Sequence, residues 1–208
     1  MTAQIHETLG FRHALAPGVD PSRAPILLLH GTGGDETDLL PLGAQVAPGT
    51  TLIAPRGAVS ENGMPRFFRR LAEGVFDEED VSRRAADLAR FVAEAREAYG
   101  LAAPIALGFS NGANIAAALL WEHPDVLAGA VLLRAMRPLA REPVGGLDGK
   151  RVLIANGAVD PLIPADRSAA FAATLEKAGA SVTLEILPAG HGLTQADLAL
   201  ASRHLADG

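Results

Sequence analysis

The chain has 208 residues, of which 49% are hydrophobic, and its formal net charge is -6 at pH 7. This length suits one α/β domain over residues 1–208, and the hydrophobic content excludes a disordered chain. The negative charge disfavours nucleic-acid binding, because contact with phosphates needs a basic face.

Cysteine is absent, which excludes disulfides, zinc–thiolate sites and a cysteine nucleophile. No apolar run approaches the length of a membrane-spanning helix. The first residues, Met1–Phe11, contain His6 and Glu7 and no run typical of a signal peptide. We therefore expect a cytoplasmic protein without a membrane span.

The first half of the chain predicts a peripheral hairpin, two buried strands and two helices. Residues 2–16 are mixed in character and predict the hairpin, with Phe11 and Leu15 as candidate inward residues. The core elements expected next are strand Ile26–Leu29, helix Asp38–Val46, strand Thr51–Ala54 and helix Glu79–Tyr99. The last of these has an apolar stripe with the period of a helix and is followed by a glycine, a common helix terminator.

A long irregular stretch, Pro55–Asp80, separates the second strand from the second helix. Loops of this length in compact domains are commonly functional or mobile. Its large apolar residues either wall a substrate pocket or fill the core below the loop, and we expect at least one to line the pocket. These residues are Met64, Phe67, Phe68 and Phe76. Its three arginines could meet an anionic substrate group, although a solvated or locally paired role is favoured; they are Arg66, Arg69 and Arg70.

The second half alternates strands with helices more regularly. The expected elements are strand Pro104–Phe109, helix Asn111–Trp121, strand Gly129–Leu133, strand Arg151–Ala155, helix Ala165–Ala178, strand Ser181–Leu187 and helix Leu193–Ala206. This alternation predicts a mostly parallel central sheet with helices on both faces and no large cap domain. In such sheets, functional sites lie at the carboxyl ends of the strands.

The segment Gly108-Phe109-Ser110-Asn111-Gly112 joins a buried strand to an alanine-rich helix. It matches the G-x-S-x-G nucleophile elbow, in which a tight turn lifts the serine hydroxyl off the sheet. The flanking glycines are needed where the strand and helix close on each other. Ser110 is therefore the candidate nucleophile; the alternative is a serine in an ordinary strand–helix turn.

A histidine base and an acid follow at later strand ends. Only His191 lies in a glycine-flanked loop after the last strand, whereas the other five histidines occupy positions less suited to a base. Asp160 follows an earlier strand, with Asp166 or Asp148 as the fallback acid. The order serine, acid, histidine is that of α/β-hydrolases, in which the acid fixes the histidine tautomer.

Glycines also follow the first core strand, in His30-Gly31-Thr32-Gly33-Gly34-Asp35. In a serine hydrolase this loop supplies one oxyanion donor, which we assign to the Thr32 N–H; the Asn111 N–H is the other. We expect His30, in the same loop, to brace the backbone and not to act as the base. A phosphate-binding loop is the rival interpretation, but no lysine follows and the spacing fits neither the P-loop nor the dinucleotide pattern.

Together, these motifs resemble the phospholipase/carboxylesterase family of α/β-hydrolases, which includes the acyl-protein thioesterases. The matching segments are the His30–Asp35 loop, Pro55-Arg56-Gly57, Gly108–Gly112, Asp160-Pro161-x-x-Pro164 and Gly190-His191. The family commonly has Gln-Gly after the nucleophile, where this chain has Asn111-Gly112. Thioesterases have a Trp-aromatic-Asp element where this chain has Arg66-Phe67-Phe68-Arg69, which disfavours protein-palmitate substrates. The resemblance is instead to a bacterial subgroup of small esterases.

The sequence thus predicts a serine carboxylesterase acting on small to medium esters through an acyl-enzyme, with no cofactor and no metal. Met136 and Leu162 are expected to bound the pocket together with the irregular stretch. Thioesterase or lysophospholipase activity, acyl transfer, perhydrolysis and a non-catalytic ligand-binding role are the alternatives. A homodimer is compatible with the sequence, which leaves the oligomeric state open.

Overall fold

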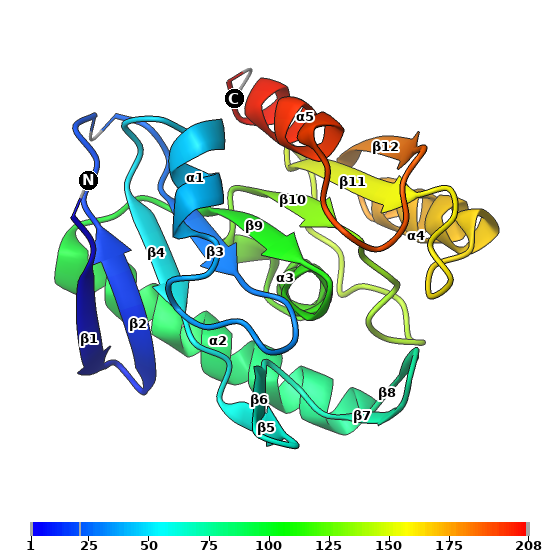
Figure 1. Ribbon diagram of the computed structural model, residues 1–208, viewed down its shortest axis with the longest axis horizontal. Helices are drawn as coiled ribbons and strands as arrows, with labels where there is room; N and C mark the ends of the chain where they lie inside the picture. The colour runs from blue at the N-terminus through cyan, green and yellow to red at the C-terminus, as the bar shows by residue number, and fades with distance from the viewer. Residues whose placement is uncertain (1, 21, 207–208) are drawn as a thin grey trace.

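A computed structural model describes residues 2–20 and 22–206. Its centre is an eight-stranded sheet with the order β1-β2-β4-β3-β9-β10-β11-β12 (Figure 1). The strands are β1 Gln4–Thr8, β2 Phe11–Ala16, β3 Ile26–Leu29, β4 Leu52–Pro55, β9 Ile105–Phe109, β10 Gly129–Leu133, β11 Arg151–Gly157 and β12 Ser181–Leu187. From β4 to β12 all neighbours are parallel, whereas β2 pairs antiparallel with both β1 and β4.

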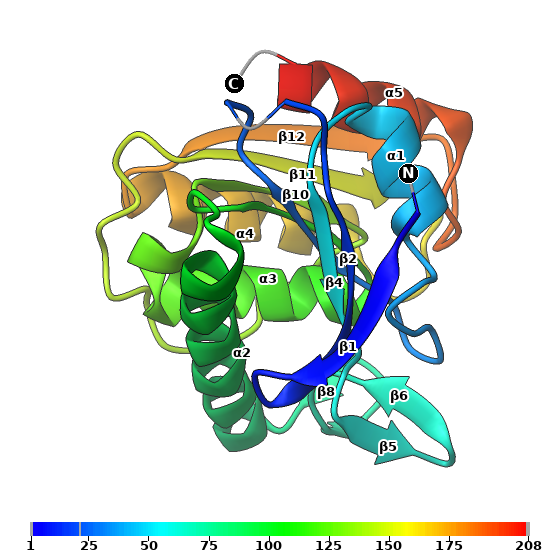
Figure 2. The ribbon, with the colours of Figure 1, turned by 90° about the vertical axis from the view of Figure 1, so that its left-hand side faces the viewer.

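Helices cover both faces of the sheet, so its central strands are uniformly apolar. The helices are α1 Leu40–Val46, α2 Glu78–Tyr99, α3 Asn111–Glu122, α4 Ala165–Lys177 and α5 Gln195–Ala206, with a short 3₁₀ turn at Pro124–Val126. Figure 2 shows α1 and α5 on one face and α2, α3 and α4 on the other. Each face has its own hydrophobic core. This mostly parallel sheet with helices on both faces is the architecture that the sequence predicts, and the described residues form no large cap domain.

Helix α3 lies at the centre of the larger core. Every residue from Asn111 to Trp121 is buried, so this helix has no solvent face. A helix that is buried all round carries apolar residues all round, and its alanines permit close approach to β3 and β9. The dense packing fixes the end of α3 that begins beside Ser110.

Helix α2 shows how local sequence sets the bounds of an element. Its N-cap, Asp77, accepts a hydrogen bond from the Asp80 N–H at 3.2 Å, and acidic residues fill the first turn, where the helix dipole favours negative charge. Gly100 ends the helix in the left-handed conformation at φ 64°, as the sequence predicts. The predicted apolar stripe is the face that α2 buries.

The stretch Pro55–Asp80 differs from the irregular loop that its sequence predicts. It contains two small antiparallel hairpins, β5 Val59–Glu61 with β6 Met64–Arg66, and β7 Arg70–Ala72 with β8 Val75–Phe76. Strands of two or three residues are too short to show a period of two, so the sequence gives no strand signal here. Both hairpins border the site described next.

Candidate active site

Ser110 lies at the turn between β9 and α3, with backbone angles φ 52° and ψ -114°. Non-glycine residues rarely adopt positive φ, so this backbone is strained and is held by its surroundings. The Ser110 N–H donates to Leu133 O on β10 at 2.9 Å, which anchors the turn to the sheet.

The two glycines of the motif have a steric reason. A Cβ on Gly112 would lie 1.9 Å from the carbonyl oxygen of Leu29, on β3. A Cβ on Gly108 would lie 2.5 Å from the carbonyl oxygen of Gly112 itself. Side chains are therefore excluded where β9, α3 and β3 meet, and the tight turn depends on that exclusion.

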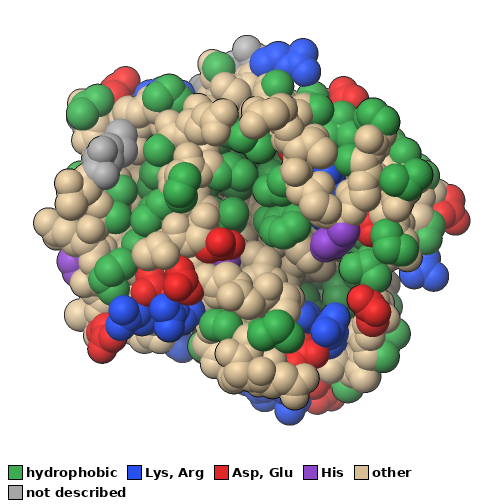
Figure 3. Space-filling view, in the orientation of Figure 1, with side chains coloured by type: hydrophobic (Ala, Val, Ile, Leu, Met, Phe, Trp, Pro, Cys, Tyr) green, Lys and Arg blue, Asp and Glu red, His purple; other side chains and the backbone are tan. Residues whose placement is uncertain are grey.

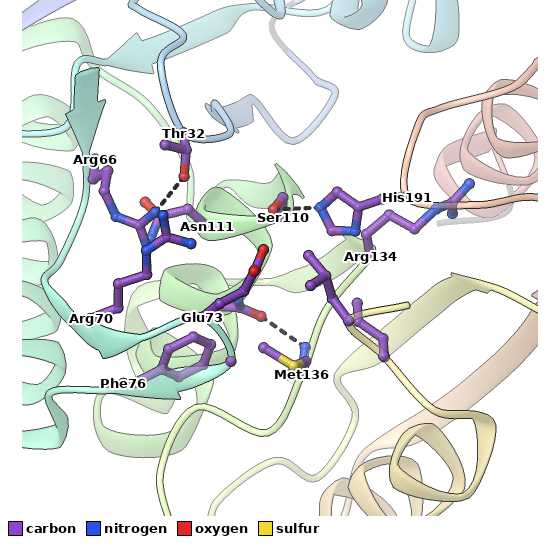
Figure 4. Close-up of a pocket in the computed structure, with 14 residues that line it drawn as sticks. Thr32, Arg66, Arg70, Glu73, Phe76, Ser110, Asn111, Arg134, Met136 and His191 are labelled. Atoms are coloured by element: carbon purple, nitrogen blue, oxygen red, sulfur yellow. Dashed lines mark hydrogen bonds between the residues drawn. The ribbon is translucent and has the colours of Figure 1, made fainter. Parts of the chain in front are cut away.

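A chain of hydrogen bonds links Ser110 to His191 and Asp160 from three separate strand ends. The Ser110 Oγ is 2.8 Å from His191 Nε2 (Figure 4), and His191 Nδ1 is 2.7 Å from Asp160 Oδ2. The Asp160 side chain is fully buried, and its Oδ1 accepts from the Leu162 N–H at 2.9 Å. With Asp160 as acceptor, Nδ1 carries the proton and Nε2 is free to accept from the serine. The fallback acids, Asp148 and Asp166, make no hydrogen bond to His191 within the described part of the chain.

The two predicted oxyanion donors lie beside Ser110, on the loop after β3 and at the start of α3 (Figure 4). The Asn111 N–H is the first of α3, so it has no acceptor inside the helix. The end of β6 holds both residues through their side chains. Arg66 Nη1 donates to Thr32 Oγ1 at 2.6 Å, and the Phe67 N–H donates to Asn111 Oδ1 at 2.7 Å.

His30 has the bracing role that the sequence predicts. Its buried ring accepts a hydrogen bond from the Gly57 N–H at Nε2 (2.9 Å), while Nδ1 lies 2.7 Å from Gly31 O. Burial lowers the pKa of His30 below its usual value, more than its backbone hydrogen bond raises it. A neutral ring, donating at one nitrogen and accepting at the other, therefore ties the glycine loop to the segment after β4.

Ser110 and His191 open into a small pocket with a volume of about 50 Å³. Its wall combines apolar and charged side chains: Thr32, Arg66, Arg70, Glu73, Phe76, Asn111, Asn114, Arg134, Met136, Leu162 and Ile163. Phe76 and Met136 also line a neighbouring apolar hollow of about 240 Å³ beside α4. The space-filling view shows acidic and basic side chains close together on this face of the molecule, below a histidine (Figure 3).

Met136 and Leu162 line the pocket as predicted, but Met64, Phe67 and Phe68 do not. Phe67 and Phe68 are buried in the core below the hairpins, where the Phe67 ring packs on His30. Met64 is partly exposed at the β5–β6 turn. The correction has a physical reason, because short hairpins have no core of their own and use such aromatic residues to fill the space beneath them. From this stretch, Phe76 is the apolar residue that lines the pocket.

Arg134 is a site residue that the sequence analysis does not single out. It follows β10 with φ 58°, is fully buried, and pairs through both terminal nitrogens with Asp197 of α5, at 2.6 and 2.9 Å. Its guanidinium also donates to the carbonyls of Gly190 and Gly192, both at 2.9 Å. These residues flank His191, so Arg134 fixes the loop that presents the imidazole. An arginine at a strand end gave no sequence signal, because most arginines are exposed.

Within the described ranges, no group of three or more His, Cys, Asp or Glu side chains could hold a metal ion. In the same residues, no helix combines the length and apolar character needed to cross a bilayer.

Comparison with known proteins shows the family of the chain. Residues 12–207 match the Phospholipase/Carboxylesterase family. MhqD of Bacillus subtilis is 46% identical over 172 residues, covering 82% of this chain and 86% of that protein. The carboxylesterase of Bacillus cereus is 44% identical with a TM-score of 0.92, covering 95% of this chain and 94% of the other. A carboxylesterase from Mesorhizobium loti is 35% identical, also with a TM-score of 0.92, over 99% of both chains. The chain therefore belongs to the phospholipase/carboxylesterase family of hydrolases.

Proposed function

We propose that this hydrolase is a serine carboxylesterase that cleaves small to medium carboxylic esters through an acyl-enzyme. The observation that carries the proposal is the continuous hydrogen-bonded chain from Ser110 through His191 to the buried Asp160, opening into a pocket. Identity above 40% to a carboxylesterase over most of the chain supports the same chemistry.

In this mechanism Ser110 Oγ attacks the ester carbonyl carbon while His191 Nε2 removes its proton. Asp160 holds the Nδ1 proton and stabilises the imidazolium that forms. The N–H groups of Thr32 and Asn111 bind the oxyanion, since α3 directs the positive end of its dipole at this point. His191 then protonates the departing alcohol, and water cleaves the acyl-enzyme by the reverse proton path.

The pocket supports a small acyl group more than a long chain. Its volume of about 50 Å³ leaves little space beside Ser110, and charged residues occupy one wall. A longer alkyl group would have to pass Phe76 and Met136 to reach the adjoining apolar hollow. Short-chain esters are therefore the expected substrates, with thioesters as a related group that the same atoms could cleave.

The first prediction concerns the nucleophile. Wild-type protein should hydrolyse short p-nitrophenyl esters and should be labelled at Ser110 by a fluorophosphonate, whereas Ser110→Ala should lose both activities. Loss of the full serine–histidine machinery typically reduces turnover by about 10⁶-fold. Turnover retained by Ser110→Ala would require a different nucleophile. A protein that binds ligands with a raised melting temperature but cleaves no ester in a broad panel would instead be a binding protein on this fold.

A further inference from the structure

Two arginines form the wall of the pocket on the side of Ser110 away from His191. Figure 4 shows the guanidinium groups of Arg66 and Arg70 close together beside Thr32 and Asn111, with the imidazole beyond Ser110. The Arg66 side chain is 4% exposed and that of Arg70 is 29% exposed. Because both guanidiniums are largely shielded from solvent, hydration alone does not explain why two cations lie at one wall of a small pocket.

One carboxylate holds both arginines from behind. The Nε atoms of Arg66 and Arg70 lie 3.1 and 2.9 Å from the two oxygens of Glu61, on β5. Arg70 Nε donates a hydrogen bond to Glu61, whereas Arg66 Nε donates to Phe68 O at 3.2 Å and is ion-paired with Glu61. Arg66 Nη1 bonds to Thr32. In the described residues, Arg66 Nη2 and both terminal nitrogens of Arg70 have no hydrogen-bond acceptor in the protein. These N–H groups are therefore held in place by the contacts of the other guanidinium nitrogens, but they have no acceptor among the described residues.

The ion pairs formed by Arg66 and Arg70 place two guanidiniums against a single carboxylate. Glu61 is shared by two guanidiniums, and Arg134 is fully paired with Asp197. Burial lowers the pKa of Arg66 and Glu61 raises it, while the neighbouring charge of Arg70 lowers it further. Glu73 also lines the pocket, but it is exposed on the β7–β8 turn and makes no ion pair within the described part of the chain. An anion bound at the arginines would relieve the repulsion between them.

The path of the proton in the proposed reaction indicates which part of the substrate lies against Arg66 and Arg70. His191 gives its proton to the leaving alcohol, so the alcohol lies on the imidazole side of Ser110. The oxyanion faces Thr32 and Asn111, which leaves the acyl group to extend along the pocket wall away from His191. We propose that Arg66 and Arg70 bind a carboxylate carried by the acyl group, so that the preferred substrates are half-esters of short dicarboxylic acids. This inference rests on the proposed esterase function.

The substrate test compares esters that differ only in charge. Ethyl hydrogen succinate, glutarate and adipate each have a matched carboxamide, in which a neutral amide of similar shape replaces the carboxylate. Released ethanol is measured for every pair. A charge-assisted hydrogen bond supports a preference of about tenfold in kcat/KM for the carboxylate in the best-fitting pair. The preference should fall as salt is added, because the pocket is open to solvent.

Variants at three positions test which residues cause the preference for the carboxylate, expressed as the ratio of kcat/KM for the charged and neutral esters. Arg70→Gln should reduce the ratio to about one, and Arg70→Lys should restore part of it. Arg69→Gln is the matched control, since Arg69 lies beside Arg70 but pairs with Asp77 and does not line the pocket. Glu73→Gln should raise the ratio by removing a negative charge from the wall. Arg66 is left intact because it also holds Thr32.

A binding measurement tests the inference independently of turnover. Glutarate should bind wild-type protein in titration calorimetry, its monoamide should bind about tenfold more weakly, and Arg70→Gln should remove the difference. Equal cleavage of charged and neutral esters, or an unchanged ratio in Arg70→Gln, would overturn the inference and leave the esterase function intact. Absence of all ester cleavage and of fluorophosphonate labelling would overturn the esterase function, and the binding comparison would then decide the inference alone.

Discussion

At the scale of single residues, Ser110 combines a strained backbone with a well-placed hydroxyl. Its angles, φ 52° and ψ -114°, belong to a region where glycine is the residue without a steric penalty. The hydrogen bond to Leu133 and the packing of α3 hold the turn in this state. Strain of this kind costs folding energy and is compensated by the rest of the core.

This strain predicts a stability difference between two variants that lack the Ser110 hydroxyl. Ser110→Gly should unfold at a higher urea concentration than Ser110→Ala, with a free energy of unfolding larger by about 1 kcal/mol, because only glycine relaxes at this backbone position. Equilibrium urea unfolding measures the difference. Equal midpoints would mean that the surrounding structure, and not the residue, carries the whole cost of the turn.

The sequence predicts some residues of the site well and others poorly. Ser110, Asp160 and His191 each follow a strand and have a glycine or proline within two residues, so their positions at one sheet edge could be inferred from topology. Arg134 and Asp197 could not, because a buried ion pair between distant elements leaves no local pattern. Their partnership depends on how α5 packs against the end of β10.

At the scale of elements, Arg134 and Asp197 join the His191 loop to helix α5. Both side chains are fully buried, and Asp197 Oδ2 also accepts from the N–H and the hydroxyl of Thr194, each at 2.8 Å. The carboxylate thus holds both the guanidinium and the residue just before the helix. Movement of α5 would be transmitted to the imidazole through this pair.

Removing the charge of Asp197 should therefore destabilise the protein strongly. Asp197→Asn leaves the guanidinium of Arg134 buried without its partner, which should lower the free energy of unfolding by about 3 kcal/mol. Asp87→Asn is the control, because Asp87 forms a partly exposed pair with Arg90 on α2 and should cost less than about 1 kcal/mol. Urea unfolding of the two variants compares them, and similar losses would show that burial does not set the strength of the Arg134 pair.

The hairpins of Pro55–Asp80 mark the limit of sequence inference for elements. The long strands and helices were predicted to within a few residues, because their apolar patterns are sustained. The hairpins β5–β6 and β7–β8 have too few residues for a pattern, and they form against the rest of the fold. The sequence also places Phe67 and Phe68 near the pocket, because a position in a loop does not show whether a side chain faces the core or the solvent.

At the scale of the whole molecule, two buried imidazoles couple stability to pH. His13 lies in the outer part of the sheet, with Nε2 2.7 Å from the Tyr99 hydroxyl, and His30 lies below the glycine loop. Burial lowers the pKa of both below the usual 6.5; for His13, the neighbouring His6 lowers it further. Above the usual pKa, both rings are neutral in folded and unfolded chains alike, so they add no pH dependence there.

As pH falls through 6.5, the unfolded chain binds protons that the folded protein does not, and stability falls until the lowered folded pKa values are reached. We expect the free energy of unfolding to be flat from about pH 8 to 7, and to drop by about 1 kcal/mol per imidazole one pH unit below its unfolded pKa. Urea unfolding at several pH values measures this. His30→Gln, which keeps an acceptor for Gly57, should show a shallower fall than the wild type, and an equal slope would contradict the assignment.

The order of the strands along the chain has a consequence for synthesis on the ribosome. The segment with Ser110 emerges and can pack against β3 well before β12 and the loop that follows it have been made. A nascent chain that ends before β12 therefore contains Ser110 but not His191, the base in the proposed mechanism. Under the proposed mechanism, such a chain would gain its base only when β12 has joined the edge of the sheet and the loop after it has folded.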